Sequence, residues 1–582
     1  MYWEVNSADS KKEIKTLSKQ LNVCNTTASL LVTRDIKSFE DAKTFFRPSL
    51  DHLHDPFLMK DMDKAVKRIS EAITNDEKIL IYGDYDVDGT SSVALVCKYL
   101  RSNSTNQIST YIPDRYDEGY GISYQSIDYA ADNDFSLVIA LDCGIKAIDK
   151  ISYANNKNID YIICDHHKPG PLIPDTIAVL NPLRDDCNYP FKYLCGCGIG
   201  FKLIQALDIV HDDWQSNIEN YLDLVAVAIG ADLVPLVGEN RTLCHFGLKV
   251  INSSPTIGLK AIIRGINKPE ITLSEVSFYI APRINSAGRI KHGNNAVELL
   301  LEENFDNAIS FSKEIDTFNL ERRGLDQLIT SQALEQLENN EEQKDFTTVV
   351  FKKDWHKGVI GIVASRLIEK YYRPTLVFTK SNDVLAASAR SVKGYDVYNA
   401  IESCKEHLIQ FGGHKYAAGL TLKPENYLAF KTSFEKHVKK TIKKEMLTPT
   451  ITVEEKIQFS EITPKFFRIL KQFAPFGPSN KQPVFWSDNL NDTGYCKTVG
   501  EEGKHLKLSL RQDNSDIFKA IAFGLGDKLS LVKNKTQFKA AFNIDENNWN
   551  GVKSVQLKLL SLIHISEPTR PRLISYAVFC LK

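Results

Sequence analysis

Apolar runs alternate with amphipathic segments through the middle of the chain. The run at 79–82 is typical of a buried strand, and further strands are predicted at 109–113, 136–141 and 161–164. The amphipathic segments between them have helical spacing. Alternating strands and helices are typical of a mostly parallel α/β sheet, so we predict such a sheet for the segment that begins at 79.

The pattern changes along the chain, which predicts an α/β protein of several domains. A second, smaller α/β pattern follows the first after a long helical stretch, and short strands with turn signals then predict an all-β barrel. The predicted segments are an N-terminal helical segment (1–78), a parallel-sheet core (79–255), a helical connector (256–340) with a long helix at 304–338, the smaller α/β domain (341–445) and the barrel (446–562).

Carboxylates and histidines follow the predicted strands of the core. Because the carboxyl ends of parallel strands share one edge of the sheet, we expect these side chains to meet there. Carboxylates packed so closely cannot all stay ionised without cations, and this ligand set suits a pair of divalent ions. The residues are Asp84, Asp86 and Asp88 after the first strand, Asp142, then Asp165, His166 and His167, and Asp232 after the apolar run 223–230, which we interpret as a strand.

The first of these loops has other interpretations. Gly89 permits a tight turn or a close backbone approach, and Thr90 is suited to cap a helix that begins near Val93. The loop could be an acidic surface turn, or the nucleophile loop of a haloacid-dehalogenase-like phosphatase, which the segment 86–90 (DVDGT) also fits. The adjacent histidines disfavour the phosphatase, which has no use for them.

Composition and charge exclude some classes of protein but do not indicate a function. The 582 residues carry a net charge of −1, so any polyanion site must be a local groove. The chain has no uncharged apolar run of membrane-spanning length and no signal-peptide pattern at its N-terminus. We therefore expect a cytoplasmic protein with reduced cysteines, without membrane partners and monomeric. The spacing of Cys195 and Cys197 is wrong for a zinc site, so we interpret the pair as structural.

The motifs GDYDVDG, LDCG and CDHH, with the later Ala231-Asp232, resemble those of the DHH phosphoesterase superfamily. The resemblance implies two Mn²⁺ or Mg²⁺ ions held by Asp84, Asp86, Asp88, Asp142, His166 and Asp232. It places His167 next to the scissile phosphate and Asp165 behind the imidazoles as an acceptor, so that Asp142, Asp165 and His167 are the implied catalytic residues. Asp223 is a weaker candidate than Asp232, because it begins the predicted strand.

Three later segments are suited to phosphate binding. Arginines flank a small-residue turn in 281–289, where the alternative is a capped loop between helices, and a serine and an arginine stand together in 387–391. Glycines before a histidine in 411–420 resemble the superfamily's accessory substrate-binding domain, DHHA1. The candidate substrate-binding residues are Arg283, Asn285, Arg289, Ser388, Arg390, Gly412, Gly413 and His414.

Over nearly its full length, the chain resembles the RecJ family of bacterial single-strand-specific DNA exonucleases. The segments that carry this resemblance include APRINSAGR, WHKGVIGIVASR, FGGHKYAAG and APFGPSNKQPVF. Departures are Ala387, where the family has Gly, and PFGPSN in place of PFGxGN. The resemblance implies 5′→3′ hydrolysis of single-stranded DNA in recombination and repair, an oligonucleotide-binding (OB) barrel, and single-strand-binding protein and a RecQ-type helicase as partners.

Two alternatives for the function stay open. One is a small-substrate enzyme of the superfamily, such as an oligoribonuclease, a cyclic-dinucleotide phosphodiesterase or a pyrophosphatase; the other is a non-catalytic DNA-binding scaffold. The last segment, 563–582, departs from the barrel pattern and resembles the peptide produced when sequencing-adapter DNA is translated. We predict that this tail is not native; the alternative is a native tail.

Overall fold

The computed structural model describes residues 2–6, 10–212, 214, 217–533, 537–549, 551–564 and 572–573. The chain forms two compact units. The larger unit is 50–447, and the smaller combines 1–49 with 448–582. The segment 1–78 is therefore divided between the two units, with its first 49 residues belonging to the unit that contains the barrel.

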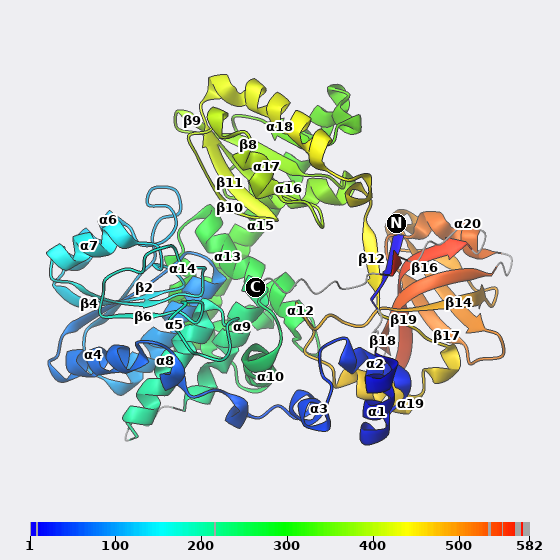
Figure 1. Cartoon of the computed structure of the whole chain (residues 1–582), viewed down its shortest axis with the longest axis horizontal. Coiled ribbons are helices and arrows are strands. Elements are labelled where there is room, and N and C mark those ends of the chain that lie inside the picture. Colours follow the sequence, from blue (N-terminus) through cyan, green and yellow to red (C-terminus); the bar gives the residue numbers. More distant parts are fainter. Residues whose placement is uncertain are drawn as a thin grey trace. The chain divides into compact units, whose positions relative to one another are not determined.

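The larger unit is built around a five-stranded parallel sheet in the order β3-β2-β4-β5-β6. Side chains alternate between its two faces, so Ile79 and Ile81 pack with one helical layer and Leu80 and Tyr82 with the other. Helices α4, α5 and α8 cover the first face, and α6 and α7 cover the second (Figure 1). The bounds are α4 (Met62–Thr74), β2 (Lys78–Gly83), α5 (Val87–Asn103), β3 (Ile108–Tyr111), α6 (Tyr124–Asp132), β4 (Phe135–Leu141), α7 (Ile148–Asn156), β5 (Asp160–Cys164), β6 (Ala178–Leu180) and α8 (Gly196–Val210).

Helices follow the sheet without further strands as far as 339 in the described chain. The prediction of a strand at 223–230 is wrong, because these residues lie in α9 and are buried on every side. A continuous apolar run does not distinguish a core strand from a core helix. The long helix predicted at 304–338 is confirmed. The bounds are α9 (Leu222–Asp232), α10 (Gly238–Ser253), α11 (Ile257–Arg264), α12 (Leu273–Glu275), a π-helix (Val276–Ile280), α13 (Ala281–Ile290), α14 (Asn294–Leu301) and α15 (Phe305–Asn339).

A second α/β domain completes the larger unit, as predicted. Its mixed five-stranded sheet has the order β10-β11-β9-β8-β7, and only β7 and β8 are parallel neighbours. The segment 411–420 forms the hairpin β10–β11. The bounds are β7 (Thr348–Phe351), α16 (Ile360–Lys370), β8 (Thr375–Ser381), β9 (Val384–Arg390), α17 (Val397–Glu402), β10 (Gln410–His414), β11 (Ala417–Leu422) and α18 (Tyr427–Thr441).

The smaller unit contains the predicted barrel. A seven-stranded sheet, β13-β14-β18-β19-β17-β16-β15, closes through an additional β14–β16 pairing. Leu17, Leu31 and Ala42 of the N-terminal helices are buried in the same core as the barrel residues Phe485 and Phe542. The bounds are β1 (Tyr2–Val5), α1 (Lys11–Leu21), α2 (Asn25–Val32), α3 (Phe39–Phe46), β12 (Thr450–Val453), β13 (Glu455–Lys456), α19 (Pro464–Lys471), β14 (Phe485–Asp492), β15 (Lys497–Val499), β16 (His505–Gln512), β17 (Phe518–Ala522), α20 (Leu529–Val532), β18 (Phe538–Trp549) and β19 (Val552–His564).

The tail is described only in part. Strand β19 extends to His564, and 572–573 form β20 beside β1. The rest of the tail lies outside the described residues, so its non-native origin stays a prediction. Among the described helices, none combines the length and the apolar character needed to cross a bilayer.

Candidate metal centre and phosphate-binding residues

The acidic loop after β2 leads directly into a helix. Helix α5 begins at Val87, earlier than predicted, because the carboxylate of Asp86 caps it by accepting from the backbone N–H groups of Asp88 and Gly89 at 3.0 and 3.1 Å. Asp88 therefore lies in the first helical turn. Gly89 permits a close approach rather than a turn, since a Cβ there would lie 2.4 Å from the carbonyl oxygen of Asp84.

The carboxylate of Asp88 is held by the start of another helix. Its two oxygens accept from the backbone N–H groups of Gly196 and Cys197 at 2.6 and 2.8 Å, where α8 begins. An anion is favoured there, because a helix N-terminus presents free N–H groups and a partial positive charge. We interpreted this Cys-Gly-Cys segment as structural, and the sequence analysis missed its role in orienting Asp88. The donors are backbone N–H groups, so no residue type in this segment signals the role.

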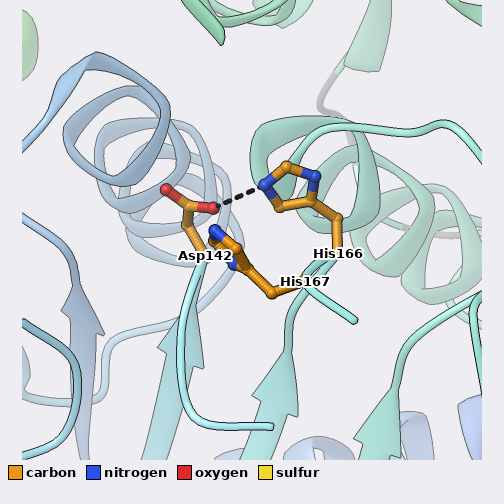
Figure 2. Close-up of side chains that lie close together, drawn as sticks. All are labelled: Asp142, His166 and His167. Atoms are coloured by element: carbon orange, nitrogen blue, oxygen red, sulfur yellow. Dashed lines mark ion pairs between the residues drawn. The ribbon is translucent and has the colours of Figure 1, made fainter. Parts of the chain in front are cut away.

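The remaining acidic candidates meet around one histidine. The His166 Nε2 atom lies 3.2 Å from Asp142 Oδ1, 3.7 Å from Asp232 Oδ2 and 3.8 Å from Asp88 Oδ2. Figure 2 shows Asp142 and His166 facing each other, with His167 beside them. The structure therefore gathers residues that follow β2, β4 and β5 with the last residue of α9.

Two groups of ligand atoms are close enough to hold metal ions. The atoms of Asp142, His166 and His167 lie within 4.8 Å of one another, and so do those of Asp88, His166 and Asp232. Asp84 Oδ1 and Asp142 Oδ1 are buried and accept no hydrogen bond from the described residues. Such unsatisfied buried oxygens, in a set of carboxylates and imidazoles, fit hard divalent ions. Asp84 and Asp86 belong to neither group.

Buried like charges disturb the ionisation of these groups. Burial, then the negative charges of neighbouring aspartates, raises the pKa values of Asp84 and Asp142 well above the ordinary range. The same two causes raise the pKa of Asp232 to about 8. Burial also lowers the pKa of His166, which favours the neutral imidazole that binds metals. The pocket is therefore short of positive charge.

His167 is held by a different set of contacts. Its Nδ1 atom lies 2.7 Å from Asp165 Oδ1, whose side chain also accepts from the backbone N–H groups of His167 and Ile145. Burial opposes protonation of His167, but the hydrogen bond and the charge of Asp165 raise its pKa. Asp165 thus orients the imidazole of His167. The sequence analysis predicted that it would orient the imidazole of His166 as well. The Tyr120 hydroxyl, which the sequence analysis missed, lies 3.2 Å from His167 Nδ1.

Arginines from the core, the connector helices and the second α/β domain lie close enough for their charges to interact. Burial, then the charges of Arg115, Arg322 and Arg390, lowers the pKa of Arg289 to about 10. Within the described chain, neither Arg289 nor Arg390 pairs with a carboxylate; Arg289 Nη1 donates to the carbonyl of Gly358 at 2.8 Å, and Arg390 Nη1 donates to Ser388 Oγ at 3.0 Å. Uncompensated guanidinium groups of this kind fit a phosphate.

The turn predicted within 281–289 is wrong, because Arg283, Asn285 and Arg289 lie on helix α13. Its small residues serve close packing instead, since a Cβ on Gly288 would lie 2.6 Å from the carbonyl oxygen of Tyr85. Arg283 is engaged by Asp316 at 2.7 Å. The candidates of 412–414 are exposed on strand β10 and belong to neither group of metal ligands.

Comparisons with known proteins agree with this architecture. Residues 78–229 match the DHH family N-terminal domain, 326–440 the DHHA1 domain and 453–561 the RecJ OB domain. The single-stranded-DNA-specific exonuclease RecJ of Bacillus subtilis is 35% identical over 566 residues, which cover 96% of this chain and 70% of that protein. The chain belongs to the RecJ family.

Other RecJ proteins extend the match. RecJ of Escherichia coli is 30% identical over 86% of this chain and 89% of its own length. The crystal structure of RecJ from Thermus thermophilus in complex with Mn²⁺ aligns with a TM-score of 0.83 and 25% identity, covering 98% of this chain and 80% of that chain. The predicted fold class, two α/β domains with a terminal OB domain, is confirmed.

Proposed function

We propose that this chain is a single-stranded-DNA-specific exonuclease that hydrolyses phosphodiester bonds from the 5′ end with two Mn²⁺ or Mg²⁺ ions. The observation that carries the proposal is the pair of buried, unsatisfied oxygens of Asp84 and Asp142 beside His166. RecJ relatives carry names that specify single-stranded DNA, and a relative's crystal structure is a complex with Mn²⁺.

The residues proposed to hold the ions are Asp84, Asp86, Asp88, Asp142, His166 and Asp232. When bound, divalent ions would polarise the scissile phosphate and lower the pKa of an attacking water. The chain's own part is positioning: the α8 N-terminus orients Asp88, and the capping role of Asp86 fixes the loop that carries Asp84.

His167 is proposed to stabilise charge that develops on the phosphate oxygens. Its Nδ1–H donates to Asp165, so the ring orientation is fixed, and we propose that Nε2, which lies 3.4 Å from the Tyr120 hydroxyl, faces the substrate. The raised pKa of His167 favours a protonated ring, which can donate from Nε2 to an anionic oxygen. Asp142, Asp165 and His167 are thus the proposed catalytic group, with Asp165 acting through His167.

We attribute the 5′→3′ direction of cleavage to Arg289 and Arg390, which we propose bind the terminal phosphate. A terminal 5′ phosphate carries more negative charge than an internal one, so it is the part of the strand best suited to Arg289 and Arg390 with Ser388. Arg283, Asn285 and the Gly412–His414 strand are proposed to hold the following phosphates. We propose that the strand end then lies beside the metal-ligand groups, because Arg289 is close enough to Asp86 for their charges to interact.

The test uses a long single strand labelled at its 3′ end, with and without a 5′ phosphate, and the matching blunt duplex. With Mn²⁺, we expect the labelled strand to shorten progressively, faster with the 5′ phosphate, while the duplex stays intact. Cleavage of dinucleotides but not of the long strand would favour the small-substrate alternative. Binding without cleavage would favour the scaffold. Single-strand-binding protein and a RecQ-type helicase remain proposed partners, testable by co-purification.

A further inference from the structure

The loop between β3 and α6, residues 112–123, contacts both the proposed catalytic histidine and a proposed phosphate-binding arginine. The Tyr120 hydroxyl lies 3.2 Å from His167 Nδ1. Four residues earlier in the same loop, the Tyr116 hydroxyl donates to the backbone carbonyl of Arg289 at 2.5 Å. One short stretch of backbone therefore reaches two separate groups of the site.

The Tyr116 hydroxyl lies where three parts of the larger unit meet. Arg289 is in the last turn of α13, where carbonyl groups lack partners within the helix, so this hydroxyl satisfies one of them. A Cβ on Gly358 of the second α/β domain would lie 2.5 Å from the Tyr116 hydroxyl oxygen and 2.6 Å from the Arg289 carbonyl oxygen, so only glycine fits there. The Arg289 guanidinium donates to the carbonyl of the same glycine. The loop thus helps to fix the backbone that carries this guanidinium.

One carboxylate ties the two ends of the loop together. Glu118 Oε1 accepts from the backbone N–H group of Asp114 at 2.8 Å. Glu118 Oε2 accepts from the hydroxyls of Tyr111, at 3.1 Å, and of Ser123. Tyr111 ends β3 and Ser123 caps α6, so a side chain in the middle of the loop is bound to both flanking elements. A carboxylate is a stronger acceptor than an amide or a hydroxyl, which makes these contacts firm.

Packing contributes little to the middle of this loop. Gly119 and Gly121 have φ values of 85° and 80°, and a Cβ on either residue would meet nothing within 4 Å. The Tyr82 hydroxyl anchors the end of the loop by donating to the Gly121 carbonyl at 2.6 Å. Both oxygens of Glu118 are occupied by donors of the loop and its flanks, so the part of Glu118 is to hold the shape of the loop.

We propose that Glu118 is a positioning residue that keeps Arg289 in register with His167. It does so by holding Tyr116 and Tyr120 at a fixed separation. The inference rests on the proposed function. A 5′ phosphate bound by the arginine speeds cleavage only if the next phosphodiester then lies beside the catalytic group. In a loose loop the two contacts would move independently, and binding of the terminal phosphate would no longer assist reaction at the scissile bond.

The experiment measures the advantage that a 5′ phosphate gives. Short single strands with a 5′ phosphate or a 5′ hydroxyl, labelled at the 3′ end, are cleaved with Mn²⁺ by enzyme in excess, and only the first cleavage is timed. The ratio of the two rate constants is the readout, because a loss of folded protein affects both rates alike. We expect Glu118→Ala to lower this ratio about fivefold, which corresponds to the contribution of one hydrogen bond.

Further variants separate this role from a general loss of stability. Tyr116→Phe keeps the ring and removes only the hydroxyl that donates to Arg289, so it should lower the same ratio even if Glu118→Ala does not fold. The double variant should lose no more than the more affected single variant, because both changes act through one loop. Asp117→Asn removes the same charge at the neighbouring, exposed residue and should keep the wild-type ratio.

The possible results distinguish the inference from the proposed function. An unchanged ratio in Glu118→Ala and in Tyr116→Phe would overturn the inference, and so would an equal fall in Asp117→Asn. A wild type that cleaves both strands at the same rate would also overturn it, since there would be no register to lose. A wild type that degrades no single strand would instead refute the proposed function.

Discussion

Helix α8 contacts two groups of buried charges that differ in how completely they are neutralised. At its N-terminus, the backbone holds Asp88 in a pocket where Asp84 and Asp142 have oxygens without donors among the described residues. In its middle, Lys202 Nζ donates to the carbonyl of His54 at 2.6 Å and lies 3.3 Å from Glu239 Oε1.

The second group is satisfied by the protein itself. Glu239 also accepts from the Tyr189 hydroxyl at 2.7 Å and from the backbone N–H group of His54 at 3.0 Å. Opposite charges and complete hydrogen bonding explain how these buried groups are tolerated. Asp84, Asp88 and Asp142 are similarly buried but carry like charges, so they need a cation from outside the chain, whereas the Asp232 side chain at the edge of this pocket is 31% exposed. The contrast separates a structural ion pair from a site that is completed by cations.

The largest expected effect is on catalysis. Asp142→Asn should reduce the rate of single-strand cleavage by about 10³-fold or more, because a neutral amide cannot replace a carboxylate among ligands of divalent ions. Asparagine tolerates the backbone φ of 61° at this position, so the fold should be preserved. Without metal, the variant should unfold at a higher denaturant concentration than the wild type, since one of several like charges is removed. A variant that stays fully active would contradict the assignment.

Disrupting the ion pair of α8 should lower stability and leave catalysis unchanged, the reverse of the effect of Asp142→Asn. Lys202→Met should lower the free energy of unfolding by about 3–5 kcal/mol, because Glu239 is left buried without its cation. The folded variant should keep its cleavage rate per molecule. The control is Lys202→Met combined with Glu239→Gln, which removes both charges and should recover part of the stability. An unchanged unfolding midpoint in Lys202→Met would contradict the interpretation of Lys202 and Glu239 as a structural ion pair.

The pH dependence of stability is a smaller effect. The pKa of Asp232 is about 8 in the folded protein, against 3.8 ordinarily, so the folded state binds more protons than the unfolded state between these values. The free energy of unfolding of the metal-stripped protein should therefore fall as pH rises through this window. Urea unfolding at several pH values should show a flatter slope for Asp232→Asn. Equal slopes would show that Asp232 ionises normally in the metal-free pocket.

Much of the candidate metal-ligand set could be predicted from the sequence, because strand ends in a parallel sheet converge on one edge. Asp142, His166 and their neighbours follow apolar runs whose order along the chain already implies this edge. Asp232 was included although its own element was assigned wrongly, since a buried helix and a buried strand have the same composition. Its position depends only on where the apolar run ends.

The contacts that the sequence did not reveal are made by the backbone or depend on tertiary packing. The N–H groups that hold Asp88 belong to Gly196 and Cys197, whose side-chain types suggest no such role. The π-helix has no established residue signature. Likewise, the closeness of Arg289 to Arg390 follows from the docking of two domains within one unit, which local periodicity does not encode.

The most direct test of the central claim counts ions. Metal-stripped protein titrated with Mn²⁺ at pH 8, followed by calorimetry and by the free-ion electron paramagnetic resonance signal, should bind two ions per chain. Asp142→Asn should lose at least one of them, while Lys202→Met, studied below its unfolding transition, should bind both. Absence of Mn²⁺ binding by the wild type, or unchanged stoichiometry and affinity in Asp142→Asn, would contradict the account.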